Sequence, residues 1–398
     1  MQVVQVCFVS TIGYPTRTKL GGVPICTRNM AHALANLGTE VRVITKRLGD
    51  GPFEENDGPI TIHGLALGNV HYYFHRIAPI GIWPRVVKAF EWGRDISRLV
   101  GQLHQQDRLD LVVYSNVWIE ASCHPKNIPF AVRMDTPLFV ARPVPGCGDK
   151  TGWDTYERLE QRVVRRADAV ICLTDSAAEQ IQIEYKLPGD KIVVIPNPVD
   201  VDCFRPGRIP AGARHRIFHP GPRLDDWQKG THILLDAMEQ VIAVFPDAQL
   251  FLAGQGKPDL SRLSPRVAES IVSLGWLDSE ELAQQYALAD LTVVPSLNYD
   301  SFPSVCLESL AAGTPVVGSA VGGIPEVVRH MDTGLIVPPG DSMALGKAIT
   351  QVLSDAALLT RMRKRARQTA EREYSLKSVG EKMSALCDRL VREHACPA

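Results

Sequence analysis

The segment from Pro295 to Gly313 carries the most informative polar residues of the chain. It begins at the end of an apolar run that predicts a strand and continues with the apolar spacing of a helix, so Asp300 lies in the loop and Glu308 lies inside the helix. The amides of Ser304 and Val305 fall in the first helical turn, where free N–H groups and the positive end of the helix dipole suit an anion. An ordinary alternative is that Asp300 only favours the helix N-terminus and that Glu308 faces solvent. Because Glu308 stands among apolar residues, we expect it to be partly buried and to need partners.

A second polar loop, from Gly221 to Gly230, contains Arg223 and Lys229 and separates a predicted strand from a predicted helix. Arg can hold two phosphate oxygens with parallel hydrogen bonds, and Lys adds a compact charge. The pair is therefore a candidate phosphate site, and solvated surface cations are the alternative.

Glycines mark two further loops. Gly21 and Gly22 follow the first predicted strand, where they either let the backbone approach a ligand or form a plain tight turn. Gly254 and Gly256 lack the third glycine of a dinucleotide fingerprint, which argues against a nicotinamide site.

These loops need a scaffold, and the chain predicts an α/β fold in which strands alternate with helices. Strands are expected at 3–10, 40–45, 109–115, 216–219, 249–253, 291–295, 315–318 and 334–337, and helices at 21–37, 230–245, 279–289, 305–312 and 342–354. Continuously apolar strands between helices indicate parallel sheets that are covered on both faces. Residues 47–82 suggest loops and edge strands, and both halves of the chain show a helix end, then Asp168 or Asp290, then a buried strand. We therefore expect two similar doubly wound domains, with ligands beyond the carboxyl ends of the strands in the cleft between them.

Composition excludes several classes of protein. The chain has 398 residues, of which 45% are hydrophobic, and 43 Lys and Arg against 44 Asp and Glu give a net charge of -1. This balance argues against a nucleic-acid partner. No apolar run reaches the roughly 18 residues of a membrane span, and the N-terminus lacks a secretory signal, so we expect a cytoplasmic protein. The basic run from Arg361 to Arg367 allows a peripheral membrane contact, but a solvated helix face is the favoured interpretation.

The motifs, taken together and in order, resemble those of the retaining nucleotide-sugar glycosyltransferases of family 4, which have the GT-B fold. The resemblance is strong over 192–374 and weak over most of the first half. It is carried by Gly21-Gly22, Asn197 to Asp200, Arg223, Lys229-Gly230, Gly254 with Gly256, Gly275, Asp300 with Glu308, and Gly322 to Glu326.

The resemblance implies two Rossmann-like domains: an acceptor-binding domain over 1–203 and a nucleotide-sugar-binding domain over 204–376, with 377–398 packing back on the first. It implies that Arg223, Lys229, Gly22, Ser304 and Val305 bind the donor diphosphate. Glu308 then holds the ribose hydroxyls, Asp300 faces the donor sugar as a catalytic residue, and Trp276 lies beside the base. The chain departs from the family in two ways: the first acid is Asp300 where Glu is usual, and the stretch from Ala131 to Pro137 lacks the expected His.

Within that stretch, Arg133 and Asp135 follow the apolar run 128–132, so we expect them at the carboxyl end of a strand. Asp135 is a candidate to orient or deprotonate an acceptor, and a structural Arg133–Asp135 pair or a cap on the turn before Pro137 is the alternative.

The expected function is the transfer of a sugar, with retention, from a nucleotide-diphosphate sugar to a hydroxyl or similar nucleophile of an unidentified acceptor. No cofactor and no metal are implied, because Arg223, Lys229 and helix amides can neutralise the diphosphate and Asp200-Val-Asp202 reads as a turn. Two alternatives remain: a nucleotide-sugar-binding GT-B protein with little turnover, and a sugar-nucleotide epimerase or phosphorylase on the same fold.

Overall fold

A computed structural model describes residues 3–10, 14, 22–47, 54–66, 83–115, 120–137, 140, 150–207 and 215–395. The chain divides into two compact units. The first unit comprises Met1–Pro196 and Val379–Ala398, and the second comprises Asn197–Ser378. The first division thus falls a few residues before the boundary expected at residue 203, inside the Pro-rich junction.

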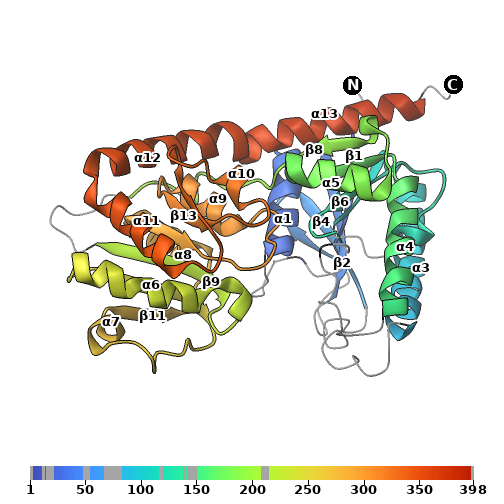
Figure 1. The fold of residues 1–398 in the computed structure, drawn as a ribbon. Coiled ribbons are helices and arrows are strands. Elements are labelled where there is room, and N and C mark those ends of the chain that lie inside the picture. Colours follow the sequence, from blue (N-terminus) through green and yellow to red (C-terminus); the bar gives the residue numbers. More distant parts are fainter. Residues whose placement is uncertain are drawn as a thin grey trace. The chain divides into compact units, whose positions relative to one another are not determined.

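The first unit contains an eight-stranded sheet in the order β3-β4-β2-β1-β5-β6-β7-β8 (Figure 1). All neighbouring strands are parallel except the edge pair β3 and β4, which lies in the stretch where the sequence indicates edge strands. The strands are β1 Gln5–Ser10, β2 Glu40–Lys46, β3 Glu54–Asp57, β4 Ile60–Leu65, β5 Leu111–Ser115, β6 Phe130–Met134, β7 Ala169–Cys172 and β8 Ile192–Val194.

Both faces of this sheet are covered, as alternation along β1 shows. Val6 and Phe8 pack with α1 and α13, whereas Cys7 and Val9 belong to the core that contains residues of α3, α4 and α5. The helices are α1 Gly22–Ala35, α3 Trp83–Gln106, α4 Lys150–Arg166, α5 Asp175–Tyr185 and α13 Leu376–Ala395, with short 3-10 helices at η2 Glu120–Cys123 and η3 Gly189–Lys191.

The C-terminal helix α13 belongs to this core, since its apolar side chains lie in the same cluster as β1 and α1. A side chain at Gly380 would place Cβ 2.8 Å from the Ala33 carbonyl oxygen, so glycine allows α13 to approach α1 closely. The α13 residues in the cluster are Val379, Met383, Leu386, Cys387 and Leu390.

The second unit contains a six-stranded parallel sheet in the order β11-β10-β9-β12-β13-β14. Its strands are β9 Arg216–Arg223, β10 Gln249–Gln255, β11 Ile271–Gly275, β12 Leu291–Val294, β13 Val316–Ser319 and β14 Gly334–Val337. Its helices are α6 Thr231–Val244, α7 Pro265–Glu269, α8 Ser279–Leu288, α9 Ser304–Ala311, α10 Ile324–Val327, α11 Ser342–Ser354 and α12 Ala356–Thr369, with a 3-10 helix η4 at Trp227–Lys229 and a π-helix η5 at Ala370–Tyr374.

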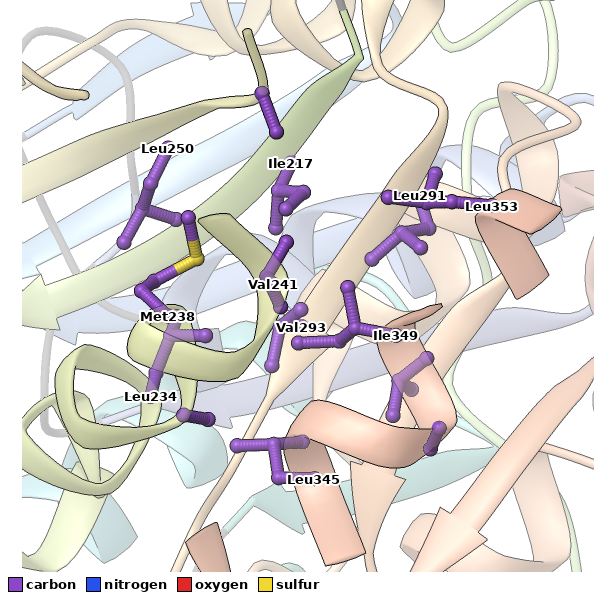
Figure 2. Close-up of a cluster of buried hydrophobic side chains, with 14 of the residues drawn as sticks. Ile217, Leu234, Met238, Val241, Leu250, Leu291, Val293, Leu345, Ile349 and Leu353 are labelled. Carbon is purple, nitrogen blue, oxygen red and sulfur yellow. The ribbon is translucent and has the colours of Figure 1, made fainter. Parts of the chain in front are cut away.

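The core of the second unit lies between α6, α11 and the central strands. Figure 2 shows Met238 of α6 beside Leu250 of β10, Val241 of α6 beside Ile217 of β9, and Ile349 of α11 beside Val293 of β12. These side chains are fully buried. Burial of these side chains contributes about 25 cal/mol per Å² of apolar surface and holds α6 on the sheet. The position of the loop that leads into α6 is fixed as a result.

In each unit an aspartate forms hydrogen bonds with the backbone where two neighbouring strands begin. These are the positions at which the two halves of the chain share a sequence pattern. The Asp168 carboxylate accepts a hydrogen bond from the Phe130 amide at 2.9 Å, and Asp290 accepts one from the Arg216 amide at 3.0 Å. The Asp168 amide in turn donates to the Phe130 carbonyl, and the Asp290 amide donates to the Arg216 carbonyl. The polar residue thus satisfies the backbone where the parallel ladder begins.

The predicted fold class is confirmed: both units are α/β and are built on parallel sheets. One strand is longer than predicted. β9 continues to Arg223 rather than ending at residue 219, because Gln255 of β10 still pairs with Arg223 after a shift of register beyond Ala253, and the Leu224 amide donates to the Gln255 carbonyl at 2.7 Å. Arg223 therefore ends a strand instead of lying free in a loop.

Two glycines with nearly the same backbone angle give a matched test of the loop packing. Gly230 has φ +70° and Gly275 has φ +72°, but a Cβ at Gly230 would lie 1.9 Å from the Pro295 carbonyl oxygen, whereas one at Gly275 meets nothing within 4 Å. We expect Gly275→Ala to lower the free energy of unfolding by about 1–2 kcal/mol, the cost of the left-handed conformation alone. Gly230→Ala should cost at least about 2 kcal/mol more, because the loop must also move. Denaturant unfolding of both variants measures the difference, and equal losses would show that the Pro295 contact is not constraining.

Candidate functional site

Three loops of the second unit are joined by backbone contacts beyond the carboxyl ends of β9, β12 and β13. The Leu297 amide donates to the Gln228 carbonyl at 2.8 Å, which joins the loop after β12 to the loop after β9. The Gly323 amide donates to the Asp300 carbonyl at 2.8 Å, and a Cβ at Gly322 would lie 2.1 Å from the same oxygen. Close backbone contact on both sides therefore fixes the position of Asp300.

Lys229 and Asp300, which are far apart in the sequence, form an ion pair at this junction. The Lys229 ammonium lies 3.1 Å from the Asp300 carboxylate, and the two side chains are 34% and 22% exposed. Lys229 is the last residue of η4, which Asp226 caps by accepting a hydrogen bond from the Gln228 amide. The two predicted site residues thus lie in contact, and partial exposure leaves them accessible to a ligand.

Arg223 has a different partner from Lys229. Its guanidinium donates from Nε and Nη2 to the two carboxylate oxygens of Asp225, at 3.0 and 2.8 Å, and the Arg223 side chain is 65% exposed. A Cβ at Gly256 would lie 2.5 Å from an Asp225 oxygen, so the glycine at 256 leaves room for this carboxylate. The arginine is held in one orientation by its forked pair, with donors left for another anion.

Glu308 lies inside α9, four residues after Ser304, and is buried as the sequence predicts. The Tyr286 hydroxyl of α8 donates to its carboxylate at 2.9 Å, and Ser304 forms a second side-chain hydrogen bond with it. Burial raises the pKa of Glu308 to about 7, while the two hydrogen bonds oppose the rise. The carboxyl group next to the first turn of α9 therefore has a pKa close to neutral pH.

Two residues that the sequence analysis did not single out support the site. Tyr286 is one, and only the folded chain brings it to Glu308. The other is His219 on β9, whose ring nitrogens lie 2.9 Å from the Val293 carbonyl and 3.1 Å from the Thr231 hydroxyl. Burial lowers the pKa of His219 to about 4, so the ring is neutral and ties β9, β12 and α6 together. A polar residue inside an apolar strand was the available signal for it.

Other predicted site residues are not joined to the Lys229–Asp300 pair. Trp276 follows the edge strand β11 and is half-buried, and no hydrogen bond or ring contact among the described residues ties it to Glu308 or Lys229. Gly22 is the exposed first residue of α1 in the first unit, and Gly21 lies outside the described residues. Ser304 and Val305 begin α9 and are both partly exposed, as a ligand-binding first turn requires.

Arg133 and Asp135 lie at the end of β6 in the first unit, and they are paired. An Arg133 nitrogen lies 2.8 Å from an Asp135 oxygen, with side chains that are only 1% and 4% exposed. Burial raises the pKa of Asp135, and the Arg133 charge opposes the rise. The Arg133–Asp135 pair that the sequence allows is thus present, and the acceptor role of Asp135 stays a prediction.

The described residues contain no group of three or more His, Cys, Asp or Glu side chains placed to hold a metal ion. The Asp200 carboxylate accepts hydrogen bonds from the amides of Asp202 and Cys203, at 2.9 and 3.0 Å, which is the geometry of a turn. Over the same described ranges, no helix is both long and apolar enough to cross a bilayer.

The raised pKa of Glu308 makes stability depend on pH in a defined direction. Because the folded chain keeps this proton up to about pH 7 and the unfolded chain loses it near 4.5, the free energy of unfolding should fall as pH rises through this window. The expected fall is up to about 3 kcal/mol, and Glu308→Gln should remove it. Denaturant unfolding between pH 4 and 8 measures the slope, with the exposed Glu269→Gln as the matched control. Parallel curves for wild type and Glu308→Gln would contradict the prediction.

Family models match both units of the chain. The model described as "Glycosyltransferase Family 4" matches residues 20–203, and the one described as "Glycosyl transferases group 1" matches residues 214–355. Two curated relatives illustrate the range of similarity. A glycogen synthase of Mycobacterium tuberculosis is 31% identical over 67% of this chain and 66% of its own length, and a D-inositol 3-phosphate glycosyltransferase of Thermobispora bispora is 28% identical over 87% and 85%.

Solved structures share the fold over nearly the whole chain. A sucrose-phosphate synthase from Thermosynechococcus elongatus is similar with a TM-score of 0.76 and 24% identity, covering 98% of this chain and 99% of that one. The trehalose-6-phosphate synthase OtsA is similar with a TM-score of 0.73 and 14% identity, covering 97% and 99%. The two matched models, the paired α/β units and these likenesses agree, and the chain belongs to the family 4 glycosyltransferases with the GT-B fold.

Proposed function

We propose that the protein transfers a sugar, with retention, from a nucleoside-diphosphate sugar to a hydroxyl or similar nucleophile of an acceptor. The observation that carries the proposal is the Lys229–Asp300 pair, whose aspartate lies in the loop that leads into the first turn of α9. A cation and a helix N-terminus in one place form an anion site, and a buried acid at Glu308 adds an acceptor for hydroxyl groups.

The reaction places negative charge on the leaving group. The bond between the anomeric carbon and the diphosphate oxygen breaks, and a bond from the acceptor oxygen to the same carbon forms. The acceptor proton leaves with the diphosphate or to solvent. Lys229, Arg223 and the amides of Ser304 and Val305 then stabilise the diphosphate as its charge develops.

The acids have separate roles in this proposal. Asp300 orients the Lys229 ammonium and faces the donor sugar. Glu308 accepts hydrogen bonds from ribose hydroxyls, and a ligand that donates hydrogen bonds favours its ionised form and lowers its raised pKa. Asp135 is proposed to orient or deprotonate the acceptor, and a purely structural pair with the buried Arg133 is the alternative.

Names of relatives suggest where substrate screening starts. A protein of similar fold from Anabaena has been solved in complex with UDP-glucose, so UDP-glucose is the first donor to test. The Thermobispora relative is named for D-inositol 3-phosphate, so inositol phosphates are the first acceptors to test.

Turnover tests the proposal and separates it from its rivals. Release of nucleoside diphosphate should require an acceptor, and the anomeric configuration of the product, read by NMR, should match that of the donor. Release without an acceptor, formation of an epimeric nucleotide sugar, or donor binding without any turnover would each contradict a transferase.

The charge on Lys229 is the part of the site with the sharpest test. Lys229→Met keeps much of the side-chain length but loses the charge-assisted contact, so kcat/KM should fall roughly 10- to 100-fold. The exposed Lys347→Met on α11 removes the same charge elsewhere in the second unit and should leave kcat/KM unchanged. Equal kinetics for the two variants would overturn the assignment.

We also expect turnover without a divalent metal, because the two cations and the helix amides supply the positive charge that a metal would supply. Activity should persist in excess chelator. Loss of turnover in chelator, with recovery on addition of magnesium or manganese, would show that a metal is required.

A further inference from the structure

Charge is strongly segregated around helix α4 of the first unit. Of its acids, Glu157 and Glu160 are buried and Asp154 is half-buried, and the Tyr185 hydroxyl donates to Glu160. The outer face instead carries four exposed arginines, spaced so that they share one side of the helix. These are Arg158, Arg162, Arg165 and Arg166, and together with Thr155, Leu159 and Gln161 they line an open hollow of about 510 Å³.

Most hydrogen-bond donors on this face are uncommitted. Arg165 Nε donates to the Tyr185 carbonyl at 3.1 Å and Arg166 Nη1 donates to the Ser122 carbonyl at 2.9 Å, which orients both side chains. Over the described residues, Arg158 and Arg162 have no hydrogen bond or ion pair, and no acid forms a salt bridge with any of the four. Since each guanidinium carries five N–H donors, the face can offer many of them to an external anion.

The basic run that the sequence brings to notice, on α12, is different. Arg363 pairs with Asp290 at 3.0 Å, Arg365 with Asp332 at 2.7 Å and Arg367 with Glu371 at 2.6 Å. These arginines are already neutralised within the second unit, which agrees with a structural and solvated role for that run. Arg361 and Lys364 of α12 are exposed and have no ion pair among the described residues, but they stand among these paired arginines, whereas none of the four α4 arginines is paired with an acid.

The length and openness of the α4 face favour an extended anionic partner. Eight helical steps from Arg158 to Arg166 span about 12 Å along the helix, so the guanidinium groups that border the open hollow can contact several neighbouring headgroups at once. The half-buried Leu159 adds apolar surface within the row, and the net charge of -1 of the whole chain disfavours nucleic acid. We propose that this α4 face binds the phosphate headgroups of an anionic lipid surface.

Vesicle binding tests the proposal. The full-length protein is mixed with vesicles of phosphatidylcholine alone or of equal parts phosphatidylcholine and phosphatidylglycerol, and the bound fraction is measured by sedimentation at increasing salt. Wild type should bind only the anionic vesicles, and binding should weaken as salt screens the charges. Arg158→Gln/Arg162→Gln should weaken binding about 5-fold for each charge removed, or roughly 25-fold for the pair.

Matched variants make the result decisive. Arg361→Gln/Lys364→Gln removes two exposed charges from α12 and should leave vesicle binding nearly unchanged, and Arg158→Lys/Arg162→Lys should retain binding because the charge is kept. The altered side chains are exposed, so melting temperatures should match wild type. Equal binding to both vesicle types, an equal loss in the α12 variant, or binding of inorganic phosphate or single-stranded RNA without vesicle binding would overturn the proposal.

Discussion

The carbonyl oxygen of Pro295 occupies the space that a side chain would need at residue 230, and the arrangement of the second unit depends on that contact. A left-handed glycine lets the turn η4 lie directly against the strand end of β12, so Lys229 projects beside the loop that carries Asp300. A second glycine contact, at Gly322, presses on the other side of the Asp300 backbone. An ion pair between partly exposed groups contributes little stability by itself, so the backbone contacts position the pair rather than the reverse.

The burial of Glu308 makes its protonation state sensitive to what binds to its carboxyl group. The pKa of about 7 means that burial disfavours the charged form of Glu308, even though Tyr286 and Ser304 are hydrogen-bonded to it. A ligand whose hydroxyl groups donate hydrogen bonds to the carboxylate adds stabilisation of the charged form beyond that from Tyr286 and Ser304. Neutral His219 complements this arrangement, because it fixes the start of α6 without adding charge near Lys229.

Local patterns in the sequence predict the elements of the second unit well, and long-range pairing limits what they predict of the site. The strand at Gly334–Val337 and the helix at Ser342–Ser354 coincide with the predicted ranges, because apolar period and turn residues are local signals. Loop residues Lys229 and Asp300 could be named but not paired, since they are 71 residues apart and only the pairing of β9 with β12 brings their loops together. Tyr286 could not be named at all, because a tyrosine in an amphipathic helix reads as ordinary core until Glu308 is placed opposite it. The end of β9 was missed for the same reason: register with β10 decides it, not the residues of β9 alone.

Cations in the two units differ in a way that bears on what each can recognise. In the second unit, Arg223, Lys229 and Arg363 each already hold a carboxylate, so an incoming anion must exchange with an oriented partner. Such exchange favours a ligand with the geometry and charge to replace a carboxylate, as a diphosphate has. On α4 of the first unit, Arg158 and Arg162 have no such partner among the described residues. Attraction of an anion to them therefore depends on the density of charge rather than on the shape of the ligand, and salt weakens it. A pre-paired cation site thus suits selection of one small substrate, and an unpaired row suits attachment to a surface whose individual charges need not be distinguished.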